Sequence, residues 1–465
     1  MAVNKFDLNI EKILEDWEVY HAVREVIANA IDEELLTGTK KIEIFKDGAK
    51  CWHIRDYGRG LSYQHLTQKE NDEKLSDPRV IGKFGIGLKD ALATFNRKGV
   101  DISIKSRHGD IALGQAEKHG FKDVVTLHAC ISPPSDSKFQ GSEFILKGCS
   151  DNDIAKAKDL FLCFSGEKIL EATQYGQVLE KKSVPGRIYV NGVQVAEEEN
   201  FLFSYNITAL NKNIQKALNR ERTNVGRTAY ASRVQNILTA CEREKVAHEL
   251  VKDLAKYDSG EHHDELGWSD VSIHACKLLN SRSKVVFFTS GEAMSAPNLV
   301  DHAKNDNYNV VIIPQKIRDK LRGIQDISGN PIRDMEQFSR DWNDSFKFSF
   351  VSEKQLNAGE KDIFRQTEQI LNLVGDRPKF IKDVLISATM RLDPHSHRET
   401  IGLWDASKGR IIIKRDQLKT LQSYAGVLLH EVAHATSGAT DVTDAFEHEL
   451  TQYLGQVVEK AIKSD

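Results

Sequence analysis

The sequence predicts an α+β protein built from several domains, and three observations support this class. The chain has 465 residues, more than one hydrophobic core usually serves. Residues 1–150 alternate stretches of helical and of strand periodicity. Near the C-terminus, the segment YAGVLLHEVAHATSG has the apolar spacing of a separate buried helix. We therefore expect domains at 1–150, 151–255 and 351–465, with a linker and a small α/β unit at 256–350.

Composition and charge narrow the class of protein. The 64 basic and 68 acidic side chains nearly balance, which argues against a chain that binds nucleic acid over its whole surface. No apolar stretch reaches membrane-spanning length, and the start of the chain lacks the apolar segment of a secretion signal. The six cysteines show no CxxC spacing. We expect a cytoplasmic protein with reduced thiols and no membrane partner.

The N-terminal elements follow from periodicity. A helix is predicted at residues 18–36, where Val23, Ile27 and Ile31 recur at helical spacing. Asp47 and Gly48 lie between two alternating stretches and predict a β-hairpin. Further strands are predicted at residues 100–116, 123–131 and 141–148.

The rest of the chain is read in the same way. Residues 151–255 continue a short α/β pattern that ends in one long helix at 228–254. The polar stretch at 256–270 predicts a linker. Two short apolar strands follow, at 284–294 and 308–317. Residues 409–418 predict another strand; at an edge it would pair with an extended substrate peptide, whereas a core position is the simpler interpretation.

The predicted N-terminal helix carries polar residues on one face. Glu25 and Asn29 are four residues apart, and Asp32 is three residues further on. A carboxylate beside a carboxamide suits a base that activates water next to a magnesium ligand. A solvated helix face is the alternative.

Two glycine-rich stretches come after this helix. In RDYGRGL, Asp56 follows a strand and would accept a hydrogen bond from an amine on a base, while Gly58 and Gly60 let the backbone approach a flat ligand. In IGKFGIGLKDAL, glycines lead into a helix, where backbone N–H groups attract anions. These glycines are Gly82, Gly85 and Gly87. A plain turn and a flexible connector are the respective alternatives.

The order of the three motifs resembles the GHKL ATPase family, which includes gyrase B, the MutL mismatch-repair proteins, histidine kinases and the ninety-kilodalton heat-shock chaperones. REVIANAIDE resembles the N box of that family, DYGRG its first glycine box and GKFGIG its second. The resemblance covers about residues 15–150. It implies a Bergerat α/β sandwich that binds ATP and Mg²⁺, followed by a transducer-like α/β domain. The glutamate of the first motif is similar to that of the gyrase, MutL and chaperone branch, which implies ATP hydrolysis.

The resemblance implies a role for each motif residue. Glu25 would position or activate the attacking water, Asn29 would hold magnesium and Asp56 would bind the adenine amine. Residues 61–87 would form a mobile lid over the phosphates. Ser142 stands where the family often has threonine. The resemblance also places these residues beside the nucleotide: Asp32, Gly58, Gly60, Gly82, Gly85 and Gly87.

A basic segment at residues 212–233 resembles the loop and following helix of the second domain of the heat-shock chaperones. In those proteins an arginine reaches the terminal phosphate of ATP. The resemblance implies this role for Arg220 or Arg222, through a charge-assisted contact. A solvated basic surface and a nucleic-acid patch are the alternatives.

The C-terminal segment carries the pattern HEVAH. His430 and His434 are four residues apart, so their imidazoles share one helix face, as two zinc ligands do. Glu431 would reach a metal-bound water as a general base. The alternative is a core helix with two satisfied histidines, although burying such polar groups is costly.

A third zinc ligand is expected on the next predicted helix. Residues 380–465 resemble gluzincin-type metallopeptidases, whose third ligand is a glutamate on the following helix. This resemblance favours Glu447, which lies beside the apolar stripe of that helix. Glu449 is one alternative. Asp441 is the other, because a related peptidase branch uses an aspartate after a short turn; otherwise it would orient a ligand.

The two resemblances together imply an ATP-gated zinc peptidase with a zincin-like C-terminal domain. We expect ATP, Mg²⁺ and Zn²⁺ as cofactors, a protein or peptide substrate and an ATP-dependent homodimer. Such a protease would suit a stress response or defence against foreign elements such as viruses. The alternative is a chaperone-like or MutL-like ATP-driven clamp with a structural or degenerate zinc site. Nucleic acid is a partner that we do not favour.

Overall fold

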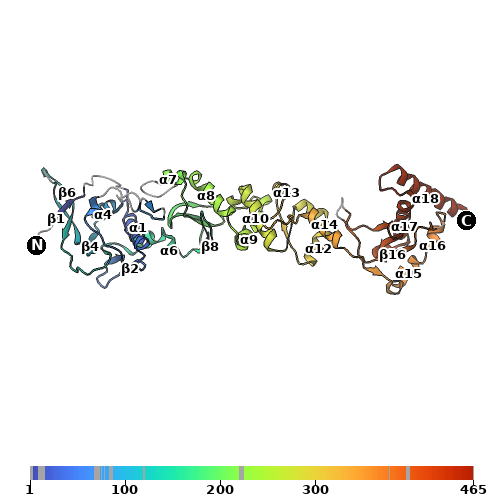
Figure 1. Cartoon of the computed structure of the whole chain (residues 1–465), viewed down its shortest axis with the longest axis horizontal. Coiled ribbons are helices and arrows are strands. Elements are labelled where there is room, and N and C mark those ends of the chain that lie inside the picture. Colours follow the sequence, from blue (N-terminus) through green and yellow to red (C-terminus); the bar gives the residue numbers. More distant parts are fainter. Residues whose placement is uncertain are drawn as a thin grey trace. The chain divides into compact units, whose positions relative to one another are not determined.

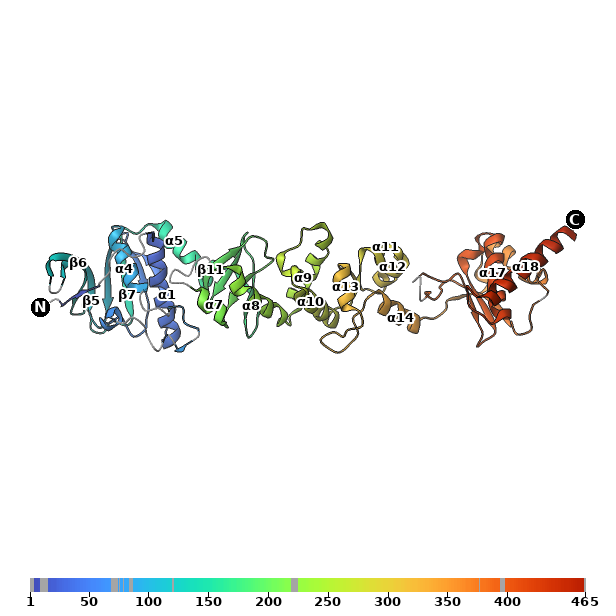
Figure 2. The ribbon, with the colours of Figure 1, turned by 90° about the horizontal axis from the view of Figure 1, so that it is seen from above.

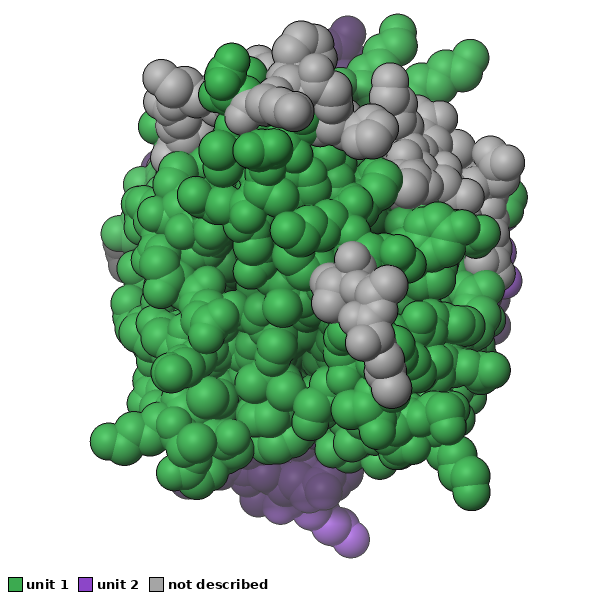
Figure 3. Space-filling model, turned by 90° about the vertical axis from the view of Figure 1, so that its left-hand side faces the viewer, with its two compact units in different colours: residues 1–253, 259–275 green, residues 254–258, 276–465 purple. Residues whose placement is uncertain are grey.

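The computed structural model contains two compact units, residues 1–253 with 259–275 and residues 254–258 with 276–465, which are coloured separately in Figure 3. The elements are labelled in Figures 1 and 2. No helix in the described part of the chain is long and apolar enough to cross a membrane. The structure describes residues 4–8, 16–67, 74, 76–77, 79–82, 87–118, 121–218, 225–375, 377–393 and 398–463.

The first unit begins with a seven-stranded sheet in which all neighbouring strands are antiparallel. The strand order is β1-β6-β5-β4-β7-β3-β2. The strands are β1 (Asn4–Asp7), β2 (Glu43–Lys46), β3 (Trp52–Arg55), β4 (Asp101–Ser106), β5 (Asp110–Lys118), β6 (Phe121–Ser132) and β7 (Ser142–Lys147). The hairpin predicted at Asp47-Gly48 is confirmed between β2 and β3.

Three helices pack on this sheet: α1 (Val19–Thr37), α4 (Gly87–Arg97) and α5 (Asp151–Asp159). Helix α1 contacts both α4 and α5 (Figure 2). Its buried face includes Val23 and Ile27, which join Ile54 of β3 and Phe144 of β7 in one apolar core. The helix ends at Gly38, whose positive φ of 65° suits glycine. The predicted helix at 18–36 is therefore confirmed. The short helices α2 (Gln64–Thr67) and α6 (Leu162–Ser165) complete this region.

A second sheet follows in the same unit, with strand order β11-β10-β12-β9-β8. Its strands are β8 (Lys168–Ala172), β9 (Gly176–Glu180), β10 (Gly186–Val190), β11 (Val193–Glu198) and β12 (Ser204–Ile207). The prediction of one helix at 228–254 is wrong, because the chain forms α8 (Arg227–Thr239) and α9 (Glu244–Leu254). At the break, the Glu171 carboxylate accepts hydrogen bonds from the backbone N–H groups of Glu242 and Arg243. The short helix α7 (Lys212–Ala217) precedes them.

Most of the polar stretch predicted as a linker, residues 259–270, belongs to the first unit. It contains two 3₁₀ turns, η1 (Tyr257–Ser259) and η2 (Asp264–Gly267), before α10 (Ser269–Arg282). The buried Glu265 carboxylate accepts hydrogen bonds from the Leu202 N–H at 2.8 Å and from the Tyr205 hydroxyl at 2.9 Å. These internal contacts differ from the free linker that the polar composition predicts.

The second unit contains the predicted small α/β region. Strands β13 (Val285–Phe288) and β14 (Asn309–Ile312) pair in parallel, which confirms both predicted strands. Its helices are α11 (Ser290–Ser295), α12 (Pro297–Asn305), α13 (Gln315–Leu321) and α14 (Met335–Ser345). Arg318 of α13 is buried and forms ion pairs with Glu292 at 3.2 Å and with Asp334 at 3.0 Å. These ion pairs connect α13 with α11 and with the start of α14.

The rest of the second unit is a four-stranded sheet of order β15-β16-β18-β17. Its strands are β15 (Phe350–Val351), β16 (Asp383–Ser387), β17 (Gly402–Asp405) and β18 (Arg410–Lys414). The core lies between this sheet and helices α15 (Ala358–Phe364), α16 (Thr367–Asn372), α17 (Leu421–Ser437) and α18 (Asp444–Lys463). Strand β18 pairs on both sides, so the simpler interpretation of 409–418 as a core strand is confirmed, and β17 is the edge strand instead. Short 3₁₀ turns lie at η3 (Glu353–Gln355) and η4 (Arg415–Lys419).

Candidate functional site

Helix α17 positions the HEVAH residues. The Thr420 hydroxyl accepts a hydrogen bond from the Ser423 N–H at 3.1 Å and caps the start of the helix. The helix ends at Gly438, which has a φ of 65°. Between these ends, His430 and His434 are one turn apart and lie on the same face. The helix predicted for this segment is therefore confirmed.

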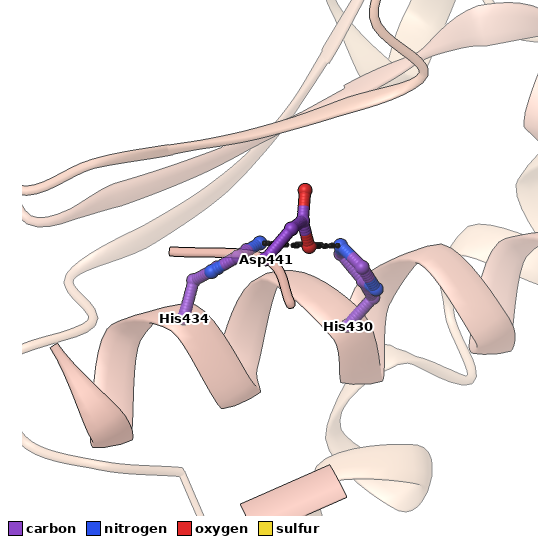
Figure 4. A group of neighbouring side chains, drawn as sticks. All are labelled: His430, His434 and Asp441. Atoms are coloured by element: carbon purple, nitrogen blue, oxygen red, sulfur yellow. Dashed lines mark hydrogen bonds and ion pairs between the residues drawn. The ribbon is translucent and has the colours of Figure 1, made fainter. Parts of the chain in front are cut away.

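Asp441 completes a compact group with the two histidines (Figure 4). Its Oδ1 atom lies 3.2 Å from Nε2 of His430 and 3.2 Å from Nε2 of His434. The two Nε2 atoms are also 3.2 Å apart. Ligand atoms about 2.1 Å from a tetrahedral zinc are separated by about 3.4 Å, so these three atoms fit the three protein corners of such a site.

The surroundings hold the histidines in the form that binds metals. The carbonyl oxygen of Ala439 lies 2.8 Å from Nδ1 of His434, which assigns the proton to Nδ1 and leaves Nε2 as the acceptor. Burial lowers the pKa of His430, which favours its neutral form. The ring of Phe446 stacks on His434 with centroids 4.3 Å apart and also contacts the ring of His430. The donors are thus two imidazoles and one carboxylate, a set that suits zinc.

Glu431 lies beside this group and is buried. Burial and, to a smaller extent, the charge of Asp441 raise the pKa of its carboxyl to about 8, although a hydrogen bond from the backbone N–H of Trp404 acts in the opposite direction. Strand β17 passes next to the Glu431 carboxyl at Gly402. A Cβ atom at Gly402 would lie 2.4 Å from Oε1 of Glu431, so this position admits the carboxyl only because it is glycine.

The third member of the group differs from the residue that we favoured. Glu447 is exposed on α18 and is not part of the group, and Glu449 faces Tyr453. The chain turns after Gly438, and this turn brings Asp441 back over α17 before α18 begins. Helical periodicity says nothing about such a turn, so the assignment moves to Asp441, which we had kept as an alternative.

In the first unit, the polar face of α1 meets the segment before α4. The Asp32 carboxylate accepts hydrogen bonds from the N–H groups of Ile81 at 2.6 Å and Gly82 at 2.7 Å. The Lys74 ammonium lies 3.1 Å from Oδ1 of Asn29 and 3.3 Å from Oδ2 of Asp32. The predicted magnesium ligand and the second glycine motif therefore meet. Lys74 was not singled out from the sequence, because a lone lysine in a polar stretch carries no signal.

Glu25 lies at the other end of the same polar face. Its carboxylate is buried and forms an ion pair with Arg24 at 2.9 Å. A Cβ atom at Gly87 would lie 2.2 Å from Oε2 of Glu25, so the start of α4 approaches this carboxylate closely. Gly85 lies outside the described residues, as do Arg220 and Arg222. Within the basic segment, Arg227 pairs with Asp264 at 2.6 Å and therefore has a structural partner.

Asp56 follows β3 as predicted and is buried. Its Oδ1 atom accepts a hydrogen bond from the Gly58 N–H at 3.0 Å, and its own N–H donates to the Ser142 carbonyl at 2.9 Å. Burial raises the pKa of Asp56. Gly60 has a φ of 87°, and Gly141, which we did not single out, approaches the Asp56 carbonyl too closely for any side chain. Asp56, Gly58 and Ser142 therefore form one local cluster.

Comparisons with known proteins give two kinds of similarity. Residues 152–244 match the family described as the Mycoplasma pneumoniae MPN635 N-terminal domain. An uncharacterized protein of Mycoplasma pneumoniae is 38% identical over 236 residues, which cover 50% of this chain and 95% of the relative. A second uncharacterized protein of that organism is 25% identical over 353 residues, 69% of this chain and 96% of the relative.

Among solved structures, a topoisomerase IV ATP-binding domain of Francisella tularensis in complex with a small-molecule inhibitor matches 38% of this chain. This chain covers 62% of that structure, with 16% identity and a TM-score of 0.22. A likeness of this size establishes no shared fold. The match to the Mycoplasma pneumoniae protein of 38% identity carries more weight, because it covers 95% of that protein. The chain belongs to the family of the uncharacterized Mycoplasma pneumoniae protein with which it is 38% identical.

Proposed function

We propose that the second unit is a zinc-dependent peptidase and that nucleotide binding in the first unit controls it. One observation carries the peptidase proposal. Nε2 of His430, Nε2 of His434 and Oδ1 of Asp441 are mutually 3.2 Å apart, the spacing that a tetrahedral metal requires. Glu431, next to His430 on the same helix, supplies the buried carboxyl that amide hydrolysis needs.

Each residue would have a distinct task. His430, His434 and Asp441 would hold the zinc, which when bound supplies a Lewis acid for the scissile carbonyl and acidifies water. Glu431 would take a proton from the attacking water and pass it to the leaving nitrogen. A carboxyl with a pKa of about 8 in the metal-free site is poised to exchange a proton near neutral pH.

The substrate would lie along β17. Among the described strands, β17 pairs only with β18, so its other edge has no strand partner there. An extended peptide would add to this edge by backbone hydrogen bonds. Because Gly402 of β17 lies against Glu431, a peptide in this position would pass close to the proposed base.

For the first unit, the polar face of α1 supports an ATP and magnesium site of the GHKL type. Asn29 would contribute a magnesium ligand, Asp56 would accept a hydrogen bond from the adenine amine, and Glu25 would position water. Lys74 now contacts Asn29 and Asp32, so its ammonium would have to move when a magnesium ion binds there. Arg220 or Arg222 would reach the terminal phosphate, and ATP would favour a homodimer.

Coupling between the two sites completes the proposal. ATP would favour one conformation of the chain and thereby alter access to the peptidase site, because a ligand shifts only an equilibrium whose states it binds differently. The coupling is tested by peptide hydrolysis with and without ATP, in the wild type and in Asp56→Ala, which removes the proposed contact to the adenine amine. Loss of the ATP effect in Asp56→Ala is expected. If ATP does not change the rate of the wild type, the proposed coupling is refuted, whereas the proposed peptidase activity is not affected.

The peptidase is tested by metal analysis of purified protein, followed by cleavage of a peptide library. We expect about one zinc per chain in the wild type, loss of zinc in His430→Ala, and retained zinc without cleavage in Glu431→Gln. Absence of zinc after metal-replete preparation would refute the proposal. Bound zinc with ATP turnover and no cleavage would favour the ATP-driven clamp instead.

A further inference from the structure

Three phenylalanines lie at alternating positions where the chain enters the C-terminal sheet. Phe346, Phe348 and Phe350 are separated by single residues, so in extended chain they share one side. The rings of Phe348 and Phe350 stack with centroids 5.6 Å apart and planes 21° apart. The ring of Phe346 meets that of Phe348 edge-on at 5.1 Å. We call these three residues the aromatic row.

The sheet fixes this row at its margin. Ser349 between the rings accepts a hydrogen bond from the Ala388 N–H at 2.8 Å, and its N–H donates to the Thr389 hydroxyl at 3.1 Å. Strand β15 then pairs with β16, and among the described strands it pairs with no other. Phe350 therefore lies on an edge strand, and Phe346 and Phe348 precede it in the chain. The side chain of Phe350 is 43% exposed, and those of Phe346 and Phe348 are half-buried.

Two arginines lie over the row. The guanidinium carbon of Arg410 is 5.1 Å from the Phe350 ring centre, and that of Arg391 is 5.7 Å from the Phe348 ring centre. Arg410 is held by Asp405 at 2.9 Å, so its charge is already paired and it supports the rings. Arg391 is exposed, and no ion pair to it occurs among the described residues. Lys347, within the row, is also exposed.

We propose that the aromatic row, with Arg391 and Lys347, binds single-stranded nucleic acid. Flat rings on an exposed edge accept unpaired bases by stacking, whichever base is present. The cation of Arg391, whose partner among the described residues is the Phe348 ring, matches the charge of the phosphate backbone. A duplex keeps its bases paired and would not stack here. This surface differs from the basic segment at 212–233, and the proposal does not depend on the peptidase or on ATP.

The charge of the row favours nucleic acid over an apolar protein partner. A protein surface that buried Phe350 would also have to bury or pair the exposed charges of Arg391 and Lys347 beside it, which is costly without acidic partners. A nucleic-acid single strand offers partners for both the rings and the cations, because its bases are apolar on their faces and its backbone is anionic. Single-stranded DNA and RNA share this chemistry, and the measurement below separates them.

The test is fluorescence anisotropy of the full-length chain with labelled 12-nucleotide oligo(dT) and oligo(U), and with a duplex of the same length. We expect both single strands to bind at least tenfold more tightly than the duplex. Phe350→Ala should weaken single-strand binding at least about fivefold, and Phe350→Tyr should restore it. Arg391→Ala should reduce the slope of log affinity against log salt by about 0.7. Thermal unfolding curves check that each variant is folded.

Matched controls come from the same unit. Phe380 is 47% exposed and contacts Trp404, and the Arg365 side chain is 64% exposed in an ion pair with Glu353. Phe380→Ala and Arg365→Ala should bind as the wild type does. A second reporter is Phe350→Trp, whose fluorescence should be quenched by a stacked base.

Three results would overturn the proposal. They are the absence of single-strand binding by the wild type, equal affinity for duplex and single strand, and an unchanged affinity in Phe350→Ala. In the last case any binding observed would be assigned to another basic surface. Tighter binding of one oligonucleotide over the other would identify DNA or RNA as the preferred single strand.

Discussion

The close approach of β17 to the proposed base gives a sharp prediction. A Cβ atom added at Gly402 would lie 2.4 Å from Oε1 of Glu431 and 2.7 Å from Cγ1 of Val427. Non-bonded carbon atoms settle at about 3.5–4.0 Å, so Gly402→Ala would displace the carboxyl by about 1 Å. The three atoms nearest to this Cβ belong to Glu431 and Val427, and none belongs to a proposed zinc ligand.

The expected cost follows from that displacement. A misplacement of about 1 Å in a catalytic group lowers the rate by about 100-fold, which corresponds to about 2.7 kcal/mol in the activation free energy. Zinc content should remain at the wild-type level, because His430, His434 and Asp441 keep their positions. The variant therefore separates positioning of the base from metal binding.

The assay is kcat/KM for the best peptide found in a library, with zinc measured in the same preparations. The control is Gly426→Ala, on the same helix as the ligands, where an added Cβ meets no atom within 4 Å. Alanine there should stabilise the helix by up to about 1 kcal/mol and leave the rate unchanged. A wild-type rate in Gly402→Ala would refute the role assigned to Glu431, as would an equal loss in both variants.

Three further predictions concern other parts of the chain. Asp441→Asn should lose bound zinc in metal analysis, whereas Glu447→Gln should keep it; the reverse result would restore our first choice of ligand. Gly87→Ala should weaken ATP binding at least about tenfold in calorimetry, because its Cβ would meet Glu25 at 2.2 Å; an unchanged Kd would contradict this. Arg318→Met should lower the free energy of unfolding by about 3–5 kcal/mol in chemical denaturation, since it leaves the buried Asp334 carboxylate without its cation; a wild-type midpoint would argue against it.

Local patterns in the sequence predicted local structure well. The helix over α1 and the hairpin at Asp47-Gly48 both follow from spacing and turn residues alone. The break between α8 and α9 does not, because helical periodicity continues on both sides of it. Its cause is the carboxylate of Glu171, which lies 71 residues earlier in the chain than the N–H group of Glu242 that it binds. Such a contact exists only after the domain has folded.

For the candidate metal group too, the sequence predicted the local arrangement but not the contacts between elements. The two histidines share a helix face by spacing, so they were predictable from the sequence. The choice of Glu447 relied on the resemblance to gluzincins and on its place beside the apolar stripe of the next helix, whereas the structure places Asp441 beside the histidines. Gly402 gave no signal, because its partner Glu431 lies on another element and only the packing of β17 on α17 brings them together.

The three proposed ligands all lie in one short segment, residues 430 to 441. Closing a loop of this length costs little entropy, so metal capture requires only α17 and the turn that follows. The environment of Glu431 is different, because it depends on β17 pairing with β18 and packing across the sheet. Contacts between neighbours in sequence form earlier in folding than contacts across a sheet. Under the proposed function, zinc binding would thus precede assembly of the peptidase site. A nascent or damaged chain would then hold zinc without cleaving other proteins.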